Sequence, residues 1–257
     1  MTVSLRFLSA SLITCFFVGA TTRAESADDL DALVAAYSDV LVGHDASNIY
    51  WKDGTVMPVG NAEPLKSFQQ RIVNASILDQ FYQKYPVGKA IAPPSNDFDP
   101  GRFRNEAFFQ KLYGDCRTGA VSRNLKSVPW FPNGQSVKIT ALHGIADHLA
   151  KVSAEIEKLP ERIRRAAYPI AGVLSCRPVA DTGKMSMHAY GAAIDLNLTY
   201  SDYWIWQSKG GKQDIRYRNR MPPEIVDIFE RHGFIWGGRW YHFDTMHFEY
   251  RPELLVQ

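Results

Sequence analysis

The most regular pattern in this chain is an amphipathic one that runs from Ala141 to Leu159. Apolar residues recur there at three- and four-residue spacing, which is the repeat of one helical face. Pro160 ends the pattern, because proline inside a helix removes a backbone hydrogen bond. A helix with one long apolar stripe must bury it against other elements. The stripe consists of Leu142, Ile145, Leu149, Val152, Ile156 and Leu159.

Short strand patterns flank this helix on both sides. A second helix is expected from Pro222 to His232, since proline suits the first helical turn and Gly233 the position after the last one. Strands and helices therefore mix without a strict βαβ alternation. This favours an α+β fold, a small antiparallel sheet with packed helices, over a doubly wound fold. The strand patterns cover Ser136–Thr140, Ile170–Ser175, Ala193–Leu198, Phe234–Trp236 and Met246–Tyr250.

The first half of the chain is less regular. Turn signals such as Lys52-Asp53-Gly54 and Asp99-Pro100-Gly101 separate short apolar pieces. We interpret residues 25–132 as an irregular, partly helical N-terminal extension. Its helix candidates are Asp29–Val42, Leu65–Tyr82 and Asn105–Tyr113.

The first 24 residues differ from the rest of the chain. A basic residue precedes an apolar stretch from Phe7 to Ala20, and Thr22 and Ala24 are small residues at the positions that precede signal cleavage. This predicts a signal peptide over residues 1–24 and an exported protein, periplasmic or extracellular. The apolar run is shorter than the ~20 residues of a spanning helix, so a membrane anchor is the weaker interpretation. A lipid anchor at Cys15 is weaker still, because that cysteine lies inside the apolar run.

Charge argues against nucleic acid as a partner. Two of the 29 basic residues, Arg6 and Arg23, lie in the predicted signal peptide, which contains no acid. The mature chain would keep 27 basic and 27 acidic residues and would be formally neutral. A nucleic-acid-binding protein needs a basic surface that neutralises phosphates, and no basic stripe of this kind remains.

Two cysteines, Cys116 and Cys176, would remain after signal cleavage. In an oxidising compartment a single pair is most simply a disulfide. The competing interpretation is two buried free thiols. Zinc ligation is disfavoured, because neither cysteine has the close Cys-x-x-Cys spacing of a structural zinc site.

Histidines and acids gather in two short segments, Ser186 to Asp195 and Asp244 to Glu249. In the first, apolar residues alternate with Asp195 and Asn197, so Asp195 faces away from the buried side of the strand. Gly191 permits a tight bend that could bring His188 back over this carboxylate. The residues expected on the buried side are Ile194, Leu196 and Leu198.

The second segment alternates in the same way, so His247 and Glu249 share one face of their strand. Two imidazoles and one carboxylate, with water in the fourth position, form a pattern typical of catalytic zinc. The predicted ligands are His188, Asp195 and His247. A base is needed to take a proton from the attacking water, and Asp244 is the best-placed candidate. Taken singly, His188 could be a structural histidine and Asp195 a buried turn carboxylate.

The two segments also resemble a known family. Ser-x-His-x-x-Gly-x-Ala-x-Asp, followed by Trp-Gly-Gly-x-Trp and Asp-x-Met-His-Phe-Glu, resembles the zinc D-alanyl-D-alanine carboxypeptidase family over roughly Ala171 to Pro252. That family includes VanY-like carboxypeptidases and L-alanyl-D-glutamate endopeptidases. The resemblance implies a hedgehog/D-Ala-D-Ala-peptidase-like fold and a zinc peptidase catalytic domain over residues 133–257. It implies Zn²⁺ held by His188, Asp195 and His247, with Asp244 as catalytic base.

The resemblance also extends to the segment Cys176-Arg177-Pro178. It places Arg177 where a guanidinium steadies the substrate or the developing oxyanion, the expected role of a fixed cationic donor. Parts of the family use glutamate as the base, whereas the endopeptidase-like branch resembles this chain in using aspartate. Asp244 therefore favours cleavage within stem peptides, but it does not determine which bond is cut.

Several neighbouring residues have two interpretations each. Ser186 could orient a ligand or the substrate, or be a turn serine, and Glu249 could support His247 or be a surface carboxylate. Trp240, with Trp236 and Tyr241, could form the wall of a cleft, although Trp236 could equally be core. The remaining candidates are His242 as an alternative acid–base group, the aromatic cluster Tyr203, Trp204 and Trp206, the loop from Gln207 to Tyr217 as a lid or a surface connection, and His148 as a structural residue.

The leading hypothesis is an exported zinc metallopeptidase that cleaves peptidoglycan stem peptides with metal-activated water, as a carboxypeptidase or an L-Ala-D-Glu-type endopeptidase. After signal cleavage no stable membrane insertion is expected. The alternative is a catalytically inactive zinc-fold binding protein of the cell envelope, as the hedgehog signalling domain resembles the family while serving as a ligand. Retention of Asp244 and Arg177 beside the predicted ligands argues against this alternative. The sequence does not indicate an oligomeric state.

Overall fold

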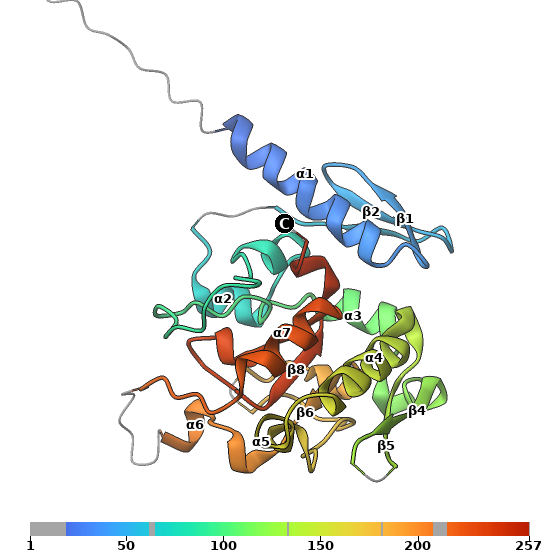
Figure 1. Cartoon of the computed structure of the whole chain (residues 1–257). Helices are drawn as coiled ribbons and strands as arrows, with labels where there is room; N and C mark the ends of the chain where they lie inside the picture. Colours follow the sequence, from blue (N-terminus) through green and yellow to red (C-terminus); the bar gives the residue numbers. More distant parts are fainter. Residues whose placement is uncertain (1–18, 62–64, 133, 181, 208–214, 257) are drawn as a thin grey trace, which may run out of the picture.

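The computed structural model describes residues 19–61, 65–132, 134–180, 182–207 and 215–256 (Figure 1). Residues 1–18, most of the predicted signal peptide, lie outside the described residues, as do residues 208–214 of the predicted loop. The other signal-peptide residues belong to helix α1 (Gly19–Ala36), so the predicted cleavage point after Ala24 falls inside this helix. In the described ranges no helix is long and apolar enough to cross a membrane.

The central sheet has three antiparallel strands in the order β6 (Ala193–Asp195), β8 (His247–Tyr250) and β7 (Phe234–Trp236). Strand β8 is therefore paired on both edges. Asp195 of β6 lies opposite His247 of β8. Directly opposite residues of antiparallel strands lie ~4.5–5.5 Å apart and point to the same face. The register alone therefore brings these two side chains together.

Two amphipathic helices, α4 (Ile145–Glu157) and α7 (Pro223–Arg231), pack against each other beside this sheet (Figure 1). Phe229 of α7 stacks on Phe248 of β8, with ring centroids 4.0 Å apart. The part of the predicted apolar stripe that lies in α4 is buried, and α7 buries Ile225, Ile228 and Phe229. Helix α4 begins later than expected, because His143 and Gly144 have φ angles of 54° and 72° and form a separate turn.

The first half of the chain forms smaller elements around this centre. Strands β1, β2 and β3 make an antiparallel sheet beside α1, and β4 and β5 make a hairpin beside α4 (Figure 1). The predicted boundary between residues 25–132 and 133–257 falls between the paired strands β4 and β5. The bounds are β1 Leu41–His44, β2 Asn48–Trp51, β3 Val56–Pro58, α2 Phe68–Val73, α3 Glu106–Tyr113, β4 Leu125–Trp130, β5 Gln135–Thr140, α5 Glu161–Arg164 and α6 Trp204–Gln207.

One hydrophobic cluster joins both halves. Leu33 of α1 and Phe108 of α3 belong to the same buried cluster as Leu149 of α4 and Phe229 of α7. Near the C-terminus, the short 3₁₀ helix Pro252–Leu254 lies against α1. The N-terminal extension is therefore built into the core, and the mixed helices and small antiparallel sheets confirm the predicted α+β class.

Two helix predictions in the N-terminal extension had the wrong bounds. The helix expected over Asp29–Val42 ends at Ala36, because the chain from Leu41 pairs as β1 with β2. The helix expected over Leu65–Tyr82 is α2 followed by a separate 3₁₀ turn, Leu78–Phe81. Asn74 breaks it with φ −140° and ψ 62°, outside the helical region. In contrast, Asn105 caps α3 as its side chain accepts a hydrogen bond from the Phe108 N–H at 2.9 Å, so that helix prediction is confirmed.

Two strand predictions in the second half were also wrong in part. Ile170–Ser175 makes only an isolated bridge, in which Gly172 pairs with Asp195. The strand expected over Ala193–Leu198 stops at Asp195. Leu198 is 51% exposed and begins a 3₁₀ turn, because the Asn197 side chain accepts a hydrogen bond from the Thr199 N–H and caps that turn.

Candidate metal centre and peptidase site

His188 reaches the sheet because a short 3₁₀ helix, Met187–Tyr190, is capped at both ends. At its start the backbone N–H of His188 donates to Ser186 Oγ at 3.3 Å. At its end Gly191 adopts a φ of 63°, the left-handed conformation that glycine takes without strain. The chain turns back there and enters β6, which carries Asp195. Ser186 therefore acts in this structure as the cap of the turn that positions His188.

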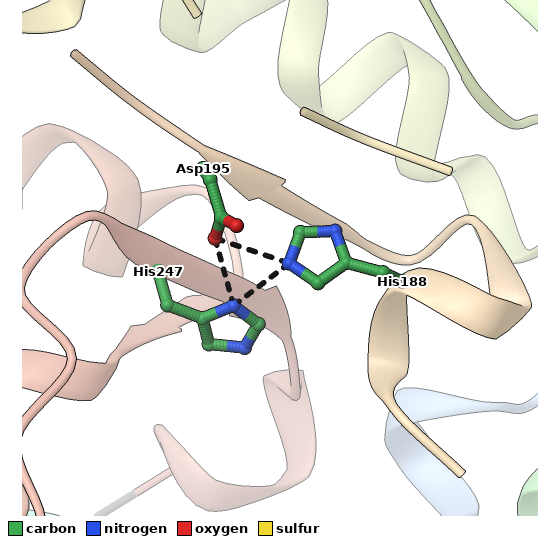
Figure 2. Close-up of side chains that lie close together, drawn as sticks. All are labelled: His188, Asp195 and His247. Carbon is green, nitrogen blue, oxygen red and sulfur yellow. Dashed lines mark hydrogen bonds and ion pairs between the residues drawn. The ribbon is translucent and has the colours of Figure 1, made fainter. Parts of the chain in front are cut away.

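Three side chains converge at one end of the central sheet (Figure 2). His188 Nε2 lies 3.0 Å from Asp195 Oδ1 and 3.1 Å from His247 Nδ1, and His247 Nδ1 lies 3.1 Å from Asp195 Oδ1. Ligands at ~2.0–2.1 Å from a tetrahedral zinc ion lie ~3.3 Å from one another. The separations are thus close to those of a metal site. Within the described ranges, this is the single group of three His, Cys, Asp or Glu residues that converges in this way.

The outer nitrogen of each imidazole has its own hydrogen-bond acceptor. His188 Nδ1–H donates to the Val173 carbonyl at 2.7 Å, and His247 Nε2–H donates to Glu249 Oε2 at 2.9 Å. Both acceptors fix the tautomer, so that the nitrogen facing the cluster keeps its lone pair. The donor set of His188, Asp195 and His247 therefore fits a divalent metal ion.

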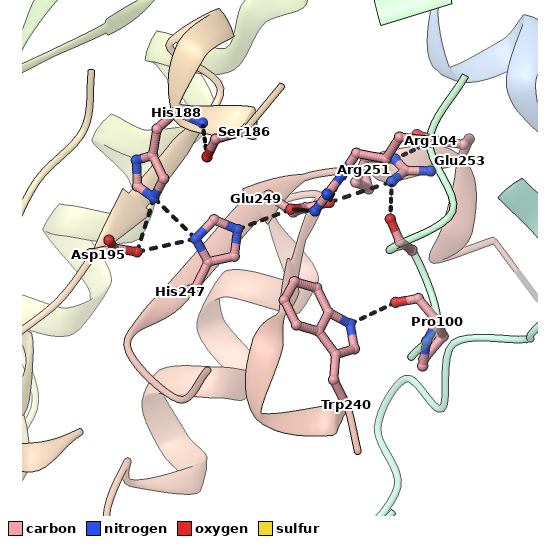
Figure 3. A network of polar contacts seen from close by, with 11 residues as sticks. Pro100, Arg104, Ser186, His188, Asp195, Trp240, His247, Glu249, Arg251 and Glu253 are labelled. Carbon is pink, nitrogen blue, oxygen red and sulfur yellow. Dashed lines mark hydrogen bonds and ion pairs between the residues drawn. The ribbon is translucent and has the colours of Figure 1, made fainter. Parts of the chain in front are cut away.

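Glu249 is fully buried and connects His247 to a chain of alternating charges (Figure 3). Arg104 forms an ion pair with its carboxylate, and Arg251 Nη1 lies 3.4 Å from Glu249 Oε1. Arg251 Nε in turn donates to Glu253 Oε1 at 2.5 Å. Burial by itself raises the pKa of Glu249, but Arg104, His247 and Arg251 outweigh it and hold the pKa below the ordinary value. Glu249 is thus a charged support for His247 and not a surface carboxylate.

The pKa values of the two acids of the centre, Asp195 and Asp244, are shifted in opposite directions. Burial by itself raises the pKa of Asp195, but the adjacent imidazoles of His188 and His247 lower it below its usual range. For Asp244, burial together with the charge of Asp195 raises the pKa to about 7. Asp244 Oδ1 is buried and has no hydrogen-bond partner in the described part of the chain. One carboxylate is therefore held ionised in the cluster, and the other is available as a proton acceptor.

A tight turn places Asp244 beside the cluster. Its N–H donates to the Gly237 carbonyl at 3.0 Å, and a side chain at Gly237 would lie 2.5 Å from the Asp244 carbonyl oxygen. At Gly238 a Cβ would lie 2.0 Å from the Trp236 ring. Both glycines are thus required for this close packing. Trp236 is fully buried, so its interpretation as core is correct.

The cluster opens into a small pocket of about 70 Å³. Arg177 lies on its lining as an exposed side chain, and Ser186, Trp240 and Asp244 line it as well. Trp240 Nε1–H donates to the Pro100 carbonyl at 2.7 Å, which fixes the indole at the wall (Figure 3). The aromatic residues Tyr203 and Trp204 complete the same lining, whereas Trp206 and Tyr241 do not contribute to it. The predicted metal ligands and base therefore meet Arg177, Ser186 and Trp240 at one pocket, and Glu249 lies behind His247.

Cys116 and Cys176 form a disulfide with a Cα–Cα distance of 5.7 Å. Cys176 directly precedes Arg177, so the bond ties the segment that carries this arginine to the N-terminal extension. His148 lies elsewhere, 5.4 Å from the Tyr250 ring, and takes no part in the centre.

The residues that sequence reasoning missed come from the N-terminal extension. Arg102 and Arg104 line the same pocket, more than 70 residues upstream of Arg177. His242, considered above as an acid–base group, lines it too, but its Nδ1 lies 2.7 Å from Asp99 Oδ2. The alternation Arg102-Phe103-Arg104 indicates that the two arginines share one side of their segment, but it does not indicate that this side faces the pocket.

Comparison with protein families gives one match. Residues 180–250 match the model of a family described as D-alanyl-D-alanine carboxypeptidase, which confirms the resemblance seen in the sequence and indicates a peptidase of this type. The matched segment contains His188, Asp195, Asp244 and His247 but neither Arg177 nor the N-terminal extension. Neither the curated proteins nor the solved structures gave a match.

Proposed function

We propose that this D-alanyl-D-alanine carboxypeptidase-like chain is an exported zinc metallopeptidase that cleaves peptidoglycan stem peptides. The observation that carries the proposal is the convergence of His188, Asp195 and His247 with Asp244, whose Oδ1 has no hydrogen-bond partner among the described residues, in one pocket. A structural metal site has four protein ligands, whereas a catalytic one keeps a position open. Three ligands beside a candidate base are the arrangement of the catalytic kind.

Zinc is the metal that two imidazoles and one carboxylate favour, and when bound it supplies Lewis acidity and lowers the pKa of water to about 7. The protein supplies the other parts of the reaction. Glu249 and the Val173 carbonyl hold the two imidazoles in the orientation and tautomer that ligation needs. Fixed ligands avoid reorganisation during the reaction.

Asp244 is the proposed general base. A positioned base typically contributes ~10²–10⁴-fold to a rate. Its Oδ1 is buried in the pocket without a hydrogen-bond partner among the described residues, so it can accept the proton of the attacking water and pass it to the leaving amine. Arg177 lies on the same lining and can donate N–H groups to the oxygen that gains negative charge.

The substrate class and the location are supported by separate observations. The family description names a carboxypeptidase for D-alanyl-D-alanine, the dipeptide at the end of peptidoglycan stems. The disulfide between Cys116 and Cys176 and the signal-peptide pattern of residues 1–24 both support export to an oxidising compartment. The aspartate base supports endopeptidase cleavage, and the family description supports carboxypeptidase cleavage.

The test is to incubate purified muropeptides with the zinc-loaded protein and to identify the products by mass spectrometry. Release of D-alanine alone would identify a carboxypeptidase, and separation of L-Ala from D-Glu an endopeptidase. The Asp244→Ala variant should bind zinc but cleave at least ~100-fold more slowly. Asp147→Ala, a surface acid paired with Lys126, is the matched control and should cleave at the normal rate. Zinc-loaded wild-type protein that cleaves no muropeptide would refute the proposal and favour the inactive binding protein.

A further inference from the structure

A segment of the N-terminal extension, Phe98–Arg104, forms one wall of the peptidase pocket. Three hydrogen bonds fix its backbone to the C-terminal half. The Tyr241 N–H donates to the Phe98 carbonyl at 2.8 Å, Trp240 Nε1–H to Pro100 at 2.7 Å, and Arg251 Nη1 to Gly101 at 2.7 Å. The segment is therefore a rigid part of the site, although it lies outside the residues that match the family model.

Gly101 allows this close approach. Its φ is 92°, and a Cβ there would lie 2.4 Å from Ile235 Cδ1 of strand β7. Any other residue would be strained at this φ and would displace the end of the Ile235 side chain. The backbone thus passes directly over β7 and brings the next residue, Arg102, to the pocket lining.

Arg102 is held in one orientation. Its side chain is 7% exposed, and Nη1 donates to Asp99 Oδ2 at 2.8 Å. Asp99 is itself fixed by His242, whose N–H donates to Oδ1 at 3.0 Å and whose Nδ1 lies 2.7 Å from Oδ2. The guanidinium carbon lies 5.7 Å from the centroid of the Trp240 ring, within the range of a cation–π contact. The charge is therefore preorganised at the pocket wall.

We propose that Arg102 binds a carboxylate group of the peptide substrate and so determines substrate specificity; this inference rests on the peptidase function proposed above. A rigid guanidinium presents paired N–H groups that match the geometry of a carboxylate. The other two arginines of the lining are differently placed, since Arg104 forms an ion pair with Glu249 behind the metal ligands and Arg177 is exposed. The extension thereby acquires a role in substrate recognition.

A stem pentapeptide with L-lysine at its third position carries two kinds of carboxylate, that of D-glutamate and that of the terminal D-alanine. Both offer the same group to Arg102, so the test uses three probes: the pentapeptide L-Ala-γ-D-Glu-L-Lys-D-Ala-D-Ala, its C-terminal amide and its D-isoglutamine form. Binding is measured by calorimetry to the zinc-loaded Asp244→Asn protein, which should not turn the peptide over. With Arg102 present, the free pentapeptide should bind about 10- to 100-fold more tightly than one of its two amide forms. The position of the amide in that weaker-binding form identifies the carboxylate that Arg102 binds.

Arg102→Met in the same background should abolish this preference while changing the affinity for that amide by less than about threefold. Arg102→Lys retains a charge beside Asp99 and should keep the fold and part of the preference. Arg123→Met, which removes an exposed arginine of the same extension, should keep the full preference for the free acid. The proposal would be overturned if the preference for the free acid survived in Arg102→Met, or if that variant lost the same affinity for all three peptides. It would also be overturned if the protein with Arg102 showed no preference for the free acid.

Cleavage of the same three peptides by the zinc-loaded wild type separates this inference from the proposed function. An Arg102-dependent binding preference without any cleavage would contradict the peptidase function alone. Cleavage with no Arg102-dependent preference would contradict the carboxylate site alone.

Discussion

Glu249 offers the sharpest test of how the interior supports the metal centre. Glu249→Gln keeps the shape of the side chain but removes the charge that accepts the His247 Nε2–H at 2.9 Å. It also leaves Arg104 and Arg251 with one buried countercharge fewer. Two losses are therefore expected together, one in metal affinity and one in stability.

The two losses have different sizes. Removing the acceptor behind a metal-bound histidine typically lowers metal affinity by ~10–100-fold, or about 1.4–2.7 kcal/mol. Breaking a buried ion pair by removing one partner typically costs ~3–5 kcal/mol of unfolding free energy. Affinity is measured by zinc titration against a chelator of known affinity. Stability is measured by urea unfolding of the metal-free protein, since bound metal would itself stabilise the fold.

Glu253→Gln is the matched control. Glu253 is equally buried and pairs with Arg251 at 2.5 Å, but it has no contact with His247 among the described interactions. It should lose a similar unfolding free energy and keep the wild-type zinc affinity. Equal losses of zinc affinity in both variants, or none in Glu249→Gln, would refute the reasoning that Glu249 orients His247.

Two further predictions concern stability. Cys116→Ser opens the disulfide with Cys176, which spans 60 residues, and should lower the unfolding free energy by about 2–4 kcal/mol; wild-type protein whose urea midpoint is unchanged by a reductant would contradict this. Gly238→Ala places a methyl group 2.0 Å from the Trp236 ring and should cost about 1–3 kcal/mol. Gly172→Ala, with no atom within 4 Å of the added Cβ, should cost less, and thermal denaturation showing equal losses would count against the packing argument.

Local sequence patterns predicted the elements whose formation depends on neighbouring residues. The apolar stripe of α4 and the proline at the start of α7 were sufficient to predict both helices, since each depends on residues within a few turns. The strand expected to Leu198 was too long because the cap at Asn197 starts a turn that alternation of polarity does not reveal. The helix expected across Asn74 failed for a similar reason.

In the candidate site, too, local patterns predicted some residues, whereas tertiary contacts place the others. Alternation along one strand predicted that His247 and Glu249 share a face, and Gly191 predicted the bend after His188. Arg102 and Arg104 could not be predicted to join them. Their placement depends on tertiary hydrogen bonds to residues about 140 positions away, such as that between Trp240 and Pro100. Sequence spacing contains no information about such a contact.

The central claim is that His188, Asp195 and His247 hold a zinc ion, and elemental analysis of the purified protein tests it most directly. Wild-type protein exposed to zinc and then dialysed should keep about one zinc per chain. His247→Ala should lose it. His242→Ala removes a histidine that lines the same pocket but lies against Asp99, and it should keep the metal. Full zinc content in His247→Ala, or equal loss in both variants, would contradict the assignment of the ligands.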